Sequence, residues 1–466
     1  MPGARSMTSH NRIRWRPALG LVLAVCLTAG CRSAVGRVGT PLSEIVAEVA
    51  DTTLVRVAVA PLDIGVTRNH RVVELRSDLD IVPAEVANVI DVATFADGRV
   101  AVLTPENVQV FSPEGRQLTT LSRPGPGPGE FRYPVALAVT GDSVLVLQML
   151  VARGELSVFL GTTGRLVGTR EVGSGGDWMG YMARGPALFQ DFPAWSGVED
   201  WSRRLGTAGG APVLFVQPPE PAPGLEDSVT KGPGVLLRLA TGRQGDTLAV
   251  LQGPPSLVRF AGSERRQAQY WEHLYESRSL WASGPGWWGM IARGDTVLDV
   301  RADDGRVSRF VWPARQMEVT EEDRTATSRY GVTYVARTSV RSRARFQQMP
   351  GREVREQYRK FLTFFPFAKW RPQATALLHA SGCALVAGFD PEAFTDGTAT
   401  AWFRISVREQ RVLDIIRVHA RDARTLHADG RGVYTRVFGE DDLPHVFRWR
   451  FPDDACLDSH APGSGS

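Results

Sequence analysis

The sequence predicts an all-β fold of the β-propeller class, and an internal repeat with a defined spacing carries this prediction. Residues 90–118 and 134–167 each read as short apolar strands separated by tight turns. Phe111 and Phe159 hold equivalent places in the two copies and are 48 positions apart, within the roughly 40–50-residue period of propeller blades. A closed ring of such blades would account for most of the 466 residues.

The first thirty residues read as a targeting segment. Three arginines between residues 12 and 16 precede an apolar run of 11 residues at 18–28, which is too short to span a bilayer comfortably. The run ends in Leu-Thr-Ala-Gly-Cys, and small residues directly before Cys31 resemble the lipobox of bacterial lipoproteins. This resemblance implies cleavage before Cys31 and a diacylglyceryl group on its thiol, which anchors a protein to a membrane without spanning it.

The residue after the cysteine bears on the destination of the chain. Arg32 stands where an aspartate would mark inner-membrane retention in many Gram-negative bacteria, and this favours the outer membrane. An ordinary secretory signal with an incidental cysteine is the alternative. Without the first thirty residues, 50 basic residues face 50 acidic ones. The mature chain is then neutral, so its charge gives no argument for a nucleic-acid partner.

Composition shifts divide the rest of the chain. The predicted parts are a signal peptide (1–30), a tether (31–50), the propeller (51–455) and a flexible tail (456–466). Within the tether, residues 41–49 fit one short helix capped by Ser43. The pattern changes to helical spacing at 319–365, where Thr320 and Asp323 resemble an N-terminal cap. We therefore expect a helical insertion between blades.

The connector between the two repeat copies is the most specific stretch. Residues 123–131 alternate proline and glycine and end in Gly-Pro-Gly-Glu-Phe. Such a sequence forms neither helix nor ladder, which predicts an exposed loop. This loop, the nearby Pro134 and the Gly-Asp turn that follows resemble NHL-type six-bladed β-propellers, above all their bacterial lipoprotein branch. The clear match covers about residues 85–170, and the expectation of six blades rests on this resemblance.

Candidate functional residues are few. No nucleophile elbow, phosphate loop or His-Glu-x-x-His motif is present, so no catalytic residue, metal site or cofactor is assigned. Aspartates beside glycine at predicted turns are read as turn residues, and His379 and His427, each just before a turn, as surface residues. Cys383 and Cys456 are candidates for a disulfide, with two separate buried thiols as the alternative.

Aromatic and basic residues supply the remaining candidates. Three tryptophans near predicted strand ends are candidates for stacking on sugars or peptides, with core packing as the alternative: Trp281, Trp287 and Trp288. The helical segment carries a basic patch, which is either a solvated face or a contact for acidic lipid headgroups or an anionic ligand: Arg341, Arg343, Arg345, Arg352, Arg355 and Arg359.

These observations predict an exported lipoprotein that acts as a non-catalytic binding or scaffold propeller of the cell envelope. Its partners would be the membrane, through Cys31, and an envelope protein, glycan or peptide. One alternative is a metal-dependent propeller enzyme of the lactonase or lyase type, and another is a glycan-binding accessory of an outer-membrane transporter. Acidic and histidine side chains converging on the axis would favour the enzyme, whereas an aromatic, uncharged funnel would favour glycan or peptide binding.

Overall fold

The computed structural model describes most of the chain after residue 40. The described residues are 41–63, 72–84, 88–150, 153–174, 205–216, 228–229, 234–239, 246–251, 257–260, 269–272, 279–325, 368–389, 400–419, 423–439 and 443–457. Residues 41–466 form one compact unit. The predicted signal peptide, Cys31, most of the helical insertion and all six arginines of the basic patch lie outside the described residues.

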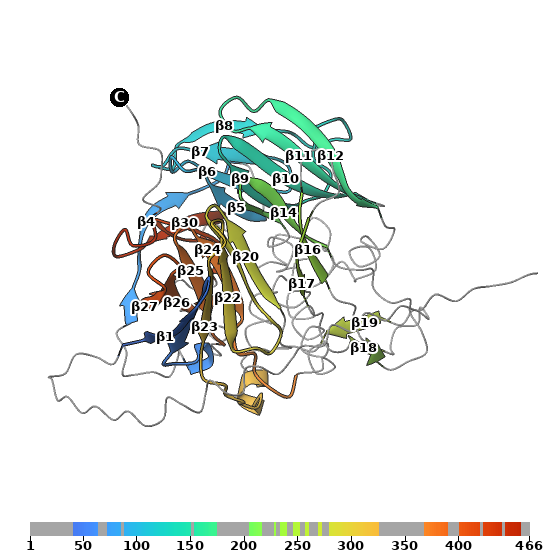
Figure 1. The fold of residues 1–466 in the computed structure, drawn as a ribbon. Coiled ribbons are helices and arrows are strands. Elements are labelled where there is room, and N and C mark those ends of the chain that lie inside the picture. The colour runs from blue at the N-terminus through green and yellow to red at the C-terminus, as the bar shows by residue number, and fades with distance from the viewer. Residues whose placement is uncertain are drawn as a thin grey trace, which may run out of the picture. The chain divides into compact units, whose positions relative to one another are not determined.

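Six antiparallel sheets form the blades of a β-propeller, which confirms both the fold class and the blade number (Figure 1). Blades 1 to 3 contain β5 (Asp91–Thr94), β6 (Val100–Leu103), β7 (Val108–Phe111) and β8 (Gln117–Leu121); β9 (Pro134–Thr140), β10 (Ser143–Leu150), β11 (Arg153–Leu160) and β12 (Leu166–Ser174); and β13 (Leu205–Ala208), β14 (Ala211–Val216), β16 (Gly234–Arg238) and β17 (Asp246–Leu251). Blades 4 to 6 contain β20 (Leu280–Gly284), β21 (Trp287–Ile291), β22 (Val297–Ala302) and β23 (Val307–Val311); β24 (Ala376–Ala380), β25 (Cys383–Ala387), β26 (Thr400–Ser406) and β27 (Arg411–Val418); and β28 (Arg424–Asp429), β29 (Gly432–Phe438), β30 (Pro444–Arg450) and β4 (Arg76–Ile81).

The first strand of every blade lies innermost. These six strands contact one another in the order β5, β9, β13, β20, β24 and β28, and β28 contacts β5 again, which closes the circle. A separate small sheet consists of β15 (Ser228–Val229), β18 (Leu257–Phe260) and β19 (Gln269–Glu272). The ring therefore surrounds a central axis to which each blade contributes one strand.

Apolar packing holds neighbouring blades together. Between blades 1 and 2, Phe131 and Phe159 meet edge to face with ring centroids 5.8 Å apart, and each is only 2% exposed. Burial of one such ring contributes roughly 1.5–3 kcal/mol. Phe131 ends the proline- and glycine-rich loop, in which Arg123 and the three prolines are exposed, as predicted, while Gly129 is buried. Within the loop, the Glu130 carboxylate accepts a hydrogen bond from the amide of Gly127 at 2.8 Å.

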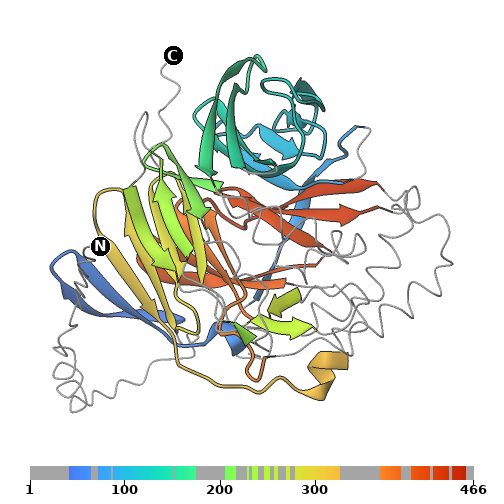
Figure 2. The same cartoon turned by 90° about the vertical axis from the view of Figure 1, so that its right-hand side faces the viewer.

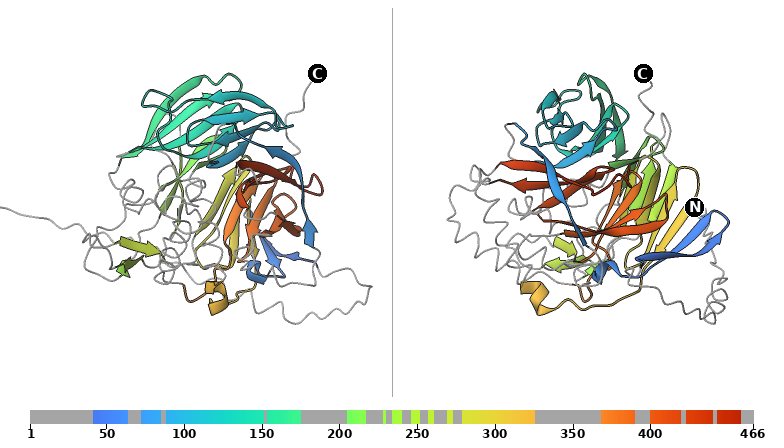
Figure 3. Two further views of the ribbon diagram at one scale, coloured as in Figure 1. Left: turned by 180° about the vertical axis from the view of Figure 1, so that it is seen from behind. Right: turned by 90° about the vertical axis from the view of Figure 1, so that its left-hand side faces the viewer.

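The N-terminal strands add to the outer edges of three successive blades. β1 (Ser43–Val49) and β2 (Thr52–Val57) extend blade 4, β3 (Val72–Glu74) extends blade 5, and β4 completes blade 6. Figures 2 and 3 show the blue N-terminal hairpin beside the yellow strands of blade 4. The expected helix at 41–49 is wrong, because β-branched Ile45 and Val46 favour a strand and the turn after Val49 returns the chain into the paired β2.

One further prediction, the helix cap at Thr320, can be compared with the structure. The chain is helical at 321–325, and Thr320 caps it as expected: the Asp323 amide donates to the Thr320 hydroxyl at 3.2 Å, and the Thr320 amide donates to the Asp323 carboxylate at 2.8 Å. The described part of the chain holds no helix with the length and apolar character that a membrane crossing needs.

Candidate ligand site in the central channel

The inner strands of all six blades line a cavity of about 420 Å³ on the propeller axis, which we call the central channel. The cavity extends to the turns that connect each inner strand to the second strand of its blade, including Gly141, Pro285 and Gly430. Side chains reach it because successive residues of a strand point to opposite faces and an inner strand exposes its free edge to the axis. The site is thus built on rigid strands rather than on loops.

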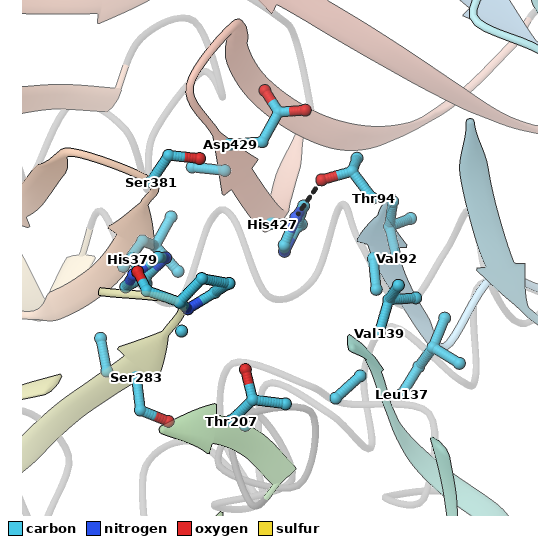
Figure 4. A pocket seen from close by; sticks show the side chains of 18 of the residues that line it. Val92, Thr94, Leu137, Val139, Thr207, Ser283, His379, Ser381, His427 and Asp429 are labelled. Carbon is cyan, nitrogen blue, oxygen red and sulfur yellow. Dashed lines mark hydrogen bonds between the residues drawn. The ribbon is translucent and has the colours of Figure 1, made fainter. Parts of the chain in front are cut away.

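One residue from each blade forms a ring around this cavity near its turn end (Figure 4). Four of them stand one position before the end of their inner strand, Thr94 ends β5, and His427 lies two positions before the end of β28. We call this set the inner ring: Thr94, Val139, Thr207, Ser283, His379 and His427. Five of the six side chains can form hydrogen bonds, and none is a permanent charge.

His379 is held by three neighbours. Its Nε2 lies 3.1 Å from the carbonyl oxygen of Pro285, and because a carbonyl only accepts, Nε2 carries the proton. The ring stacks on Trp287 with centroids 4.5 Å apart. A Cβ at Gly284 would lie 2.3 Å from the His379 ring, so glycine is what makes room for the imidazole. The sequence therefore fixes both the position and the tautomer of this side chain.

Both imidazoles of the inner ring are neutral at pH 7. Burial lowers the pKa of His379 to about 3; the Pro285 carbonyl opposes this lowering and the neighbouring His427 adds to it. Burial also lowers the pKa of His427 to about 4, against the opposing attraction of Asp429. His427 Nε2 lies 3.1 Å from the Thr94 hydroxyl, which joins blade 6 to blade 1 across the ring. Neutral imidazoles offer one donor and one acceptor each.

Asp429 lines the channel but is engaged by the protein itself. One carboxylate oxygen accepts the amides of Arg431 and Gly432 at 2.8 and 3.0 Å, and the other accepts the Tyr434 hydroxyl at 3.1 Å. This is the turn role that its position beside glycine predicts. Among the described residues, no group of three or more His, Cys, Asp or Glu side chains lies close enough to hold a metal ion.

The three candidate tryptophans occupy different environments. Trp281 on β20 is 8% exposed; it lines the channel and also packs in an apolar cluster with Ala208 and Val213 of blade 3. Trp287 is 2% exposed and its ring stacks on that of His379. Its indole N–H donates a hydrogen bond to the Ser381 carbonyl at 2.5 Å. Trp288 does not line the channel, and the Arg301 guanidinium lies 5.6 Å from its ring centroid. Of the three, Trp281 is the one placed to touch a ligand in the channel.

Cys383 and Cys456 form a disulfide in the structure, with their Cα atoms 5.0 Å apart. Cys456 is fully buried, so the packed part of the chain extends past the predicted start of the tail at 456. Cys31 and the six arginines lie outside the described residues, and their roles stay predictions.

The prediction that His379 and His427 are surface residues is wrong, because both line the central channel. A position just before a turn is exposed in an outer strand, but in the first strand of a blade it faces the axis. The signal that could have found them is the similarity of His379-Ala-Ser-Gly and His427-Ala-Asp-Gly. These two stretches hold nearly the same place in consecutive blades.

Comparisons with known proteins add little to this geometry. No protein-family profile matches the sequence, and no curated protein does. A candidate exported protein of Bacteroides fragilis is 9% identical, with 86% of this chain and 100% of that chain covered and a TM-score of 0.44. The mitotic checkpoint complex contains a chain that is 10% identical, with 91% and 100% covered and a TM-score of 0.37. The PQQ-bound aldose sugar dehydrogenase of Streptomyces coelicolor is 10% identical, with 81% and 97% covered and a TM-score of 0.34. With TM-scores this low, none of these proteins carries an argument about function, and the NHL-type resemblance stays a prediction.

Proposed function

We propose that this protein is an exported, lipid-anchored β-propeller that binds an uncharged polar ligand, such as a glycan, in its central channel without catalysing a reaction. The observation that supports the binding site is the inner ring: five neutral hydrogen-bonding side chains converge on one cavity. The lipobox-like sequence ending at Cys31 supports the anchor.

The chemistry of the channel suits a ligand of this class. Its volume of about 420 Å³ falls in the range of ligand pockets, roughly 300–1,000 Å³. Hydroxyl and imidazole groups match the hydroxyls of a sugar, while Trp281 and Val139 offer apolar surface to its C–H groups. The buried Ser283 hydroxyl has no hydrogen-bond partner among the described residues. Its oxygen is shielded from solvent and packs against blade 3, where a Cβ on Gly206 would come within 2.2 Å of it, so it would have to rotate to reach a ligand in the channel.

Thermal shift assays on the Cys31→Ser chain test the site. A panel of neutral oligosaccharides and peptides would be screened, each with and without EDTA. A ligand at 100 times its dissociation constant adds about 2.7 kcal/mol to the free energy of unfolding. Thr207→Val should reduce the shift, because it removes one hydroxyl from the inner ring. Thr169→Val on the exposed face of β12 is the matched control and should not. No shift with any neutral ligand would contradict the proposed ligand class.

The anchor has a separate test. In the native host, Cys31→Ser should move the protein from the membrane fraction to the soluble fraction, because the acylated thiol is lost. An unchanged membrane-bound pool would contradict the lipid anchor and leave the channel proposal untouched. Ser33→Ala, two residues further on, is the matched control for the substitution itself.

The lactonase- or lyase-type enzyme is favoured by two histidines and the carboxylate of Asp429, which all line the channel. A melting temperature that falls with EDTA and returns with one divalent metal would move support to this alternative.

A further inference from the structure

The last described residues of the chain form a strap between blades 5 and 6, which we call the C-terminal strap (residues 451–457). It begins where the Phe451 amide donates to the Arg431 carbonyl at 2.9 Å. Near its end the Gly382 amide donates to the Cys456 carbonyl at 2.9 Å. The strap therefore passes from the turn of blade 6 to the turn of blade 5, at the same end of the channel as the inner ring.

Strong contacts fix this strap. Arg404, only 1% exposed, forms an ion pair with Asp453 at 2.6 Å and another with Asp414 of its own blade at 2.6 Å. A buried charge that lost one of these partners would be costly, so the pairing holds Asp453 firmly. The Cys383–Cys456 disulfide then ties the far end of the strap to the first residue of β25. The middle and the far end of the segment are thereby attached to blade 5, while its beginning is attached to blade 6.

The strap also touches the channel itself. Leu457 lines the cavity, and it is the one lining residue in the described chain that belongs to neither an inner strand nor its turn. A Cβ at Gly430 would lie 2.9 Å from the Cys456 carbonyl oxygen and 3.1 Å from the Leu457 Cα, so the strap lies directly on the turn of blade 6. Leu457 is 42% exposed, as expected for a side chain at the rim of an opening.

We propose that the C-terminal strap is a built-in wall of the channel mouth, in which Leu457 narrows the approach to His379 and His427 and the disulfide holds Leu457 in place. Cleaving the disulfide or shortening residue 457 should widen the opening. This inference concerns access to the channel and does not depend on which ligand the channel binds.

Chemical labelling with diethyl pyrocarbonate measures this access directly. The reagent acylates unprotonated imidazole nitrogen, and both channel histidines are unprotonated at pH 7. Labelling rates at each histidine of the full-length protein would be read by peptide mass spectrometry. His419, whose side chain is 52% exposed, reports whether the reagent is equally active in every sample. Circular dichroism on each variant would restrict the comparison to temperatures at which it is folded.

Four variants separate the strap from general loosening of the fold. Leu457→Ala and the Cys383→Ser/Cys456→Ser pair should label His379 and His427 several-fold faster than the unaltered chain. Leu457→Trp should label them more slowly, because a larger side chain fills the rim. Val167→Ala removes a similarly exposed side chain from β12 and should change nothing.

The outcomes decide the proposal even if the serine pair is unstable, because the Leu457 variants alter an exposed side chain. Equal rates in Leu457→Ala, Leu457→Trp and the unaltered chain would overturn it, since the reagent would then enter elsewhere. Faster labelling in the serine pair alone would overturn it too, because Leu457 would then play no part in access.

Discussion

The central channel has two chemically different sides. Of the lining residues labelled in Figure 4, blades 1 and 2 contribute Val92, Thr94, Leu137 and Val139, whereas blades 5 and 6 contribute His379, Ser381, His427 and Asp429. Thr140 of blade 2 and Leu377 and Leu378 of blade 5 also line the channel. The backbone geometry is the same on both sides, because each side is built from the first strands of two blades. The difference teaches that the propeller supplies a circular frame, and that single residues near the strand ends decide what the frame can bind.

The two sides also differ in how they are held. The blade 1 and 2 side combines apolar packing, represented by the Phe131–Phe159 contact at 5.8 Å, with one buried hydrogen bond in which the Asp91 carboxylate accepts the Leu137 amide at 2.9 Å. On the blade 5 and 6 side a disulfide, a buried arginine and oriented hydrogen bonds act together. Polar groups in a cavity lose water, so their positions must be enforced by specific partners. The following predictions test this contrast, from the largest expected effect to the smallest.

Among the substitutions, removing the disulfide should destabilise the protein most at neutral pH. The bridge closes a loop between residues 73 positions apart, and the loop-entropy model assigns about 4 kcal/mol to a loop of this length. Cys383→Ser with Cys456→Ser should lower the free energy of unfolding by that order in urea titrations. Leu457→Ala, next to the bridge, should stay within about 0.5 kcal/mol. A loss in the serine pair no larger than that of Leu457→Ala would show that packing alone holds the strap.

Acidification should weaken the blade 5 and 6 side specifically. The pKa of His379 is lowered to about 3 and that of His427 to about 4, chiefly by burial, whereas an unfolded histidine titrates near 6.5. The unfolded chain therefore takes up protons first as the pH falls below about 6.5. Stability is fully present above that pH and falls toward pH 4, at up to about 1.4 kcal/mol per pH unit for each proton.

Urea titrations between pH 7.5 and pH 4.5 measure this dependence. His379→Gln with His427→Gln should flatten the slope, because glutamine does not titrate. Thr169→Val on the exposed face of β12 removes no titratable group and should leave the slope unchanged. An equally steep slope in the double variant would mean that other groups cause the acid sensitivity.

A side chain that crowds His379 should lower the free energy of unfolding by a smaller amount. Gly284→Ala places a Cβ 2.3 Å from the imidazole, and overpacking of this kind costs about 1–3 kcal/mol. The displaced ring should also weaken binding of any channel ligand found by thermal shift. Gly168→Ala on β12 is the matched control, since nothing lies within 4 Å of its added Cβ. If the NMR chemical shifts of His379 were the same in Gly284→Ala as in the unaltered chain, Gly284 would not be needed to make room for this ring.

Altering the apolar side should have the smallest effect on stability. Val139→Thr keeps the shape and adds a hydroxyl that faces the cavity, where it can stay hydrated. We expect a change in the free energy of unfolding of less than about 0.5 kcal/mol, measured by urea titration. Ligand preference in the thermal shift panel should nevertheless move toward more polar compounds. A loss above about 1 kcal/mol would mean that Val139 packs in the core rather than facing the channel.

The repeat in blades 1 and 2 could be predicted because the first two strands of each blade are short and apolar and are joined by an Asp-Gly turn at 97–98 and a Gly-Asp turn at 141–142. β28 (Arg424–Asp429) carries no such signal, because its alternating polar residues form no apolar run. β4 lacks it too, since only Leu79 and Ile81 of Arg76–Ile81 are buried. Its partner β30 is supplied by the other end of the chain, and a local pattern does not reveal such a pairing.

The candidate site was harder to predict than the fold. A period-2 pattern identifies a strand but does not tell an inner strand from an outer one, so His379 and His427 looked like surface residues. Their surroundings depend on residues far away in sequence, such as Gly284 and Pro285 beside His379. The connection between Cys383 and Cys456 was expected only as one of two possibilities, because nothing in the sequence sets the distance between two cysteines 73 positions apart.

The pairing of β4 with β30 affects the order in which the strands can fold. Asp78 and Asp80 meet Arg448 and His445 across the last sheet, at a separation of about 365 residues. β4 must therefore wait for its partner strand until the last blade has been synthesised, whereas β2 and β3 pair with blades 4 and 5. Contacts this distant in sequence slow folding, so we expect the ring to close as one late step. A chain cut short before residue 444 would leave β4 as an open edge, ready to pair with another molecule.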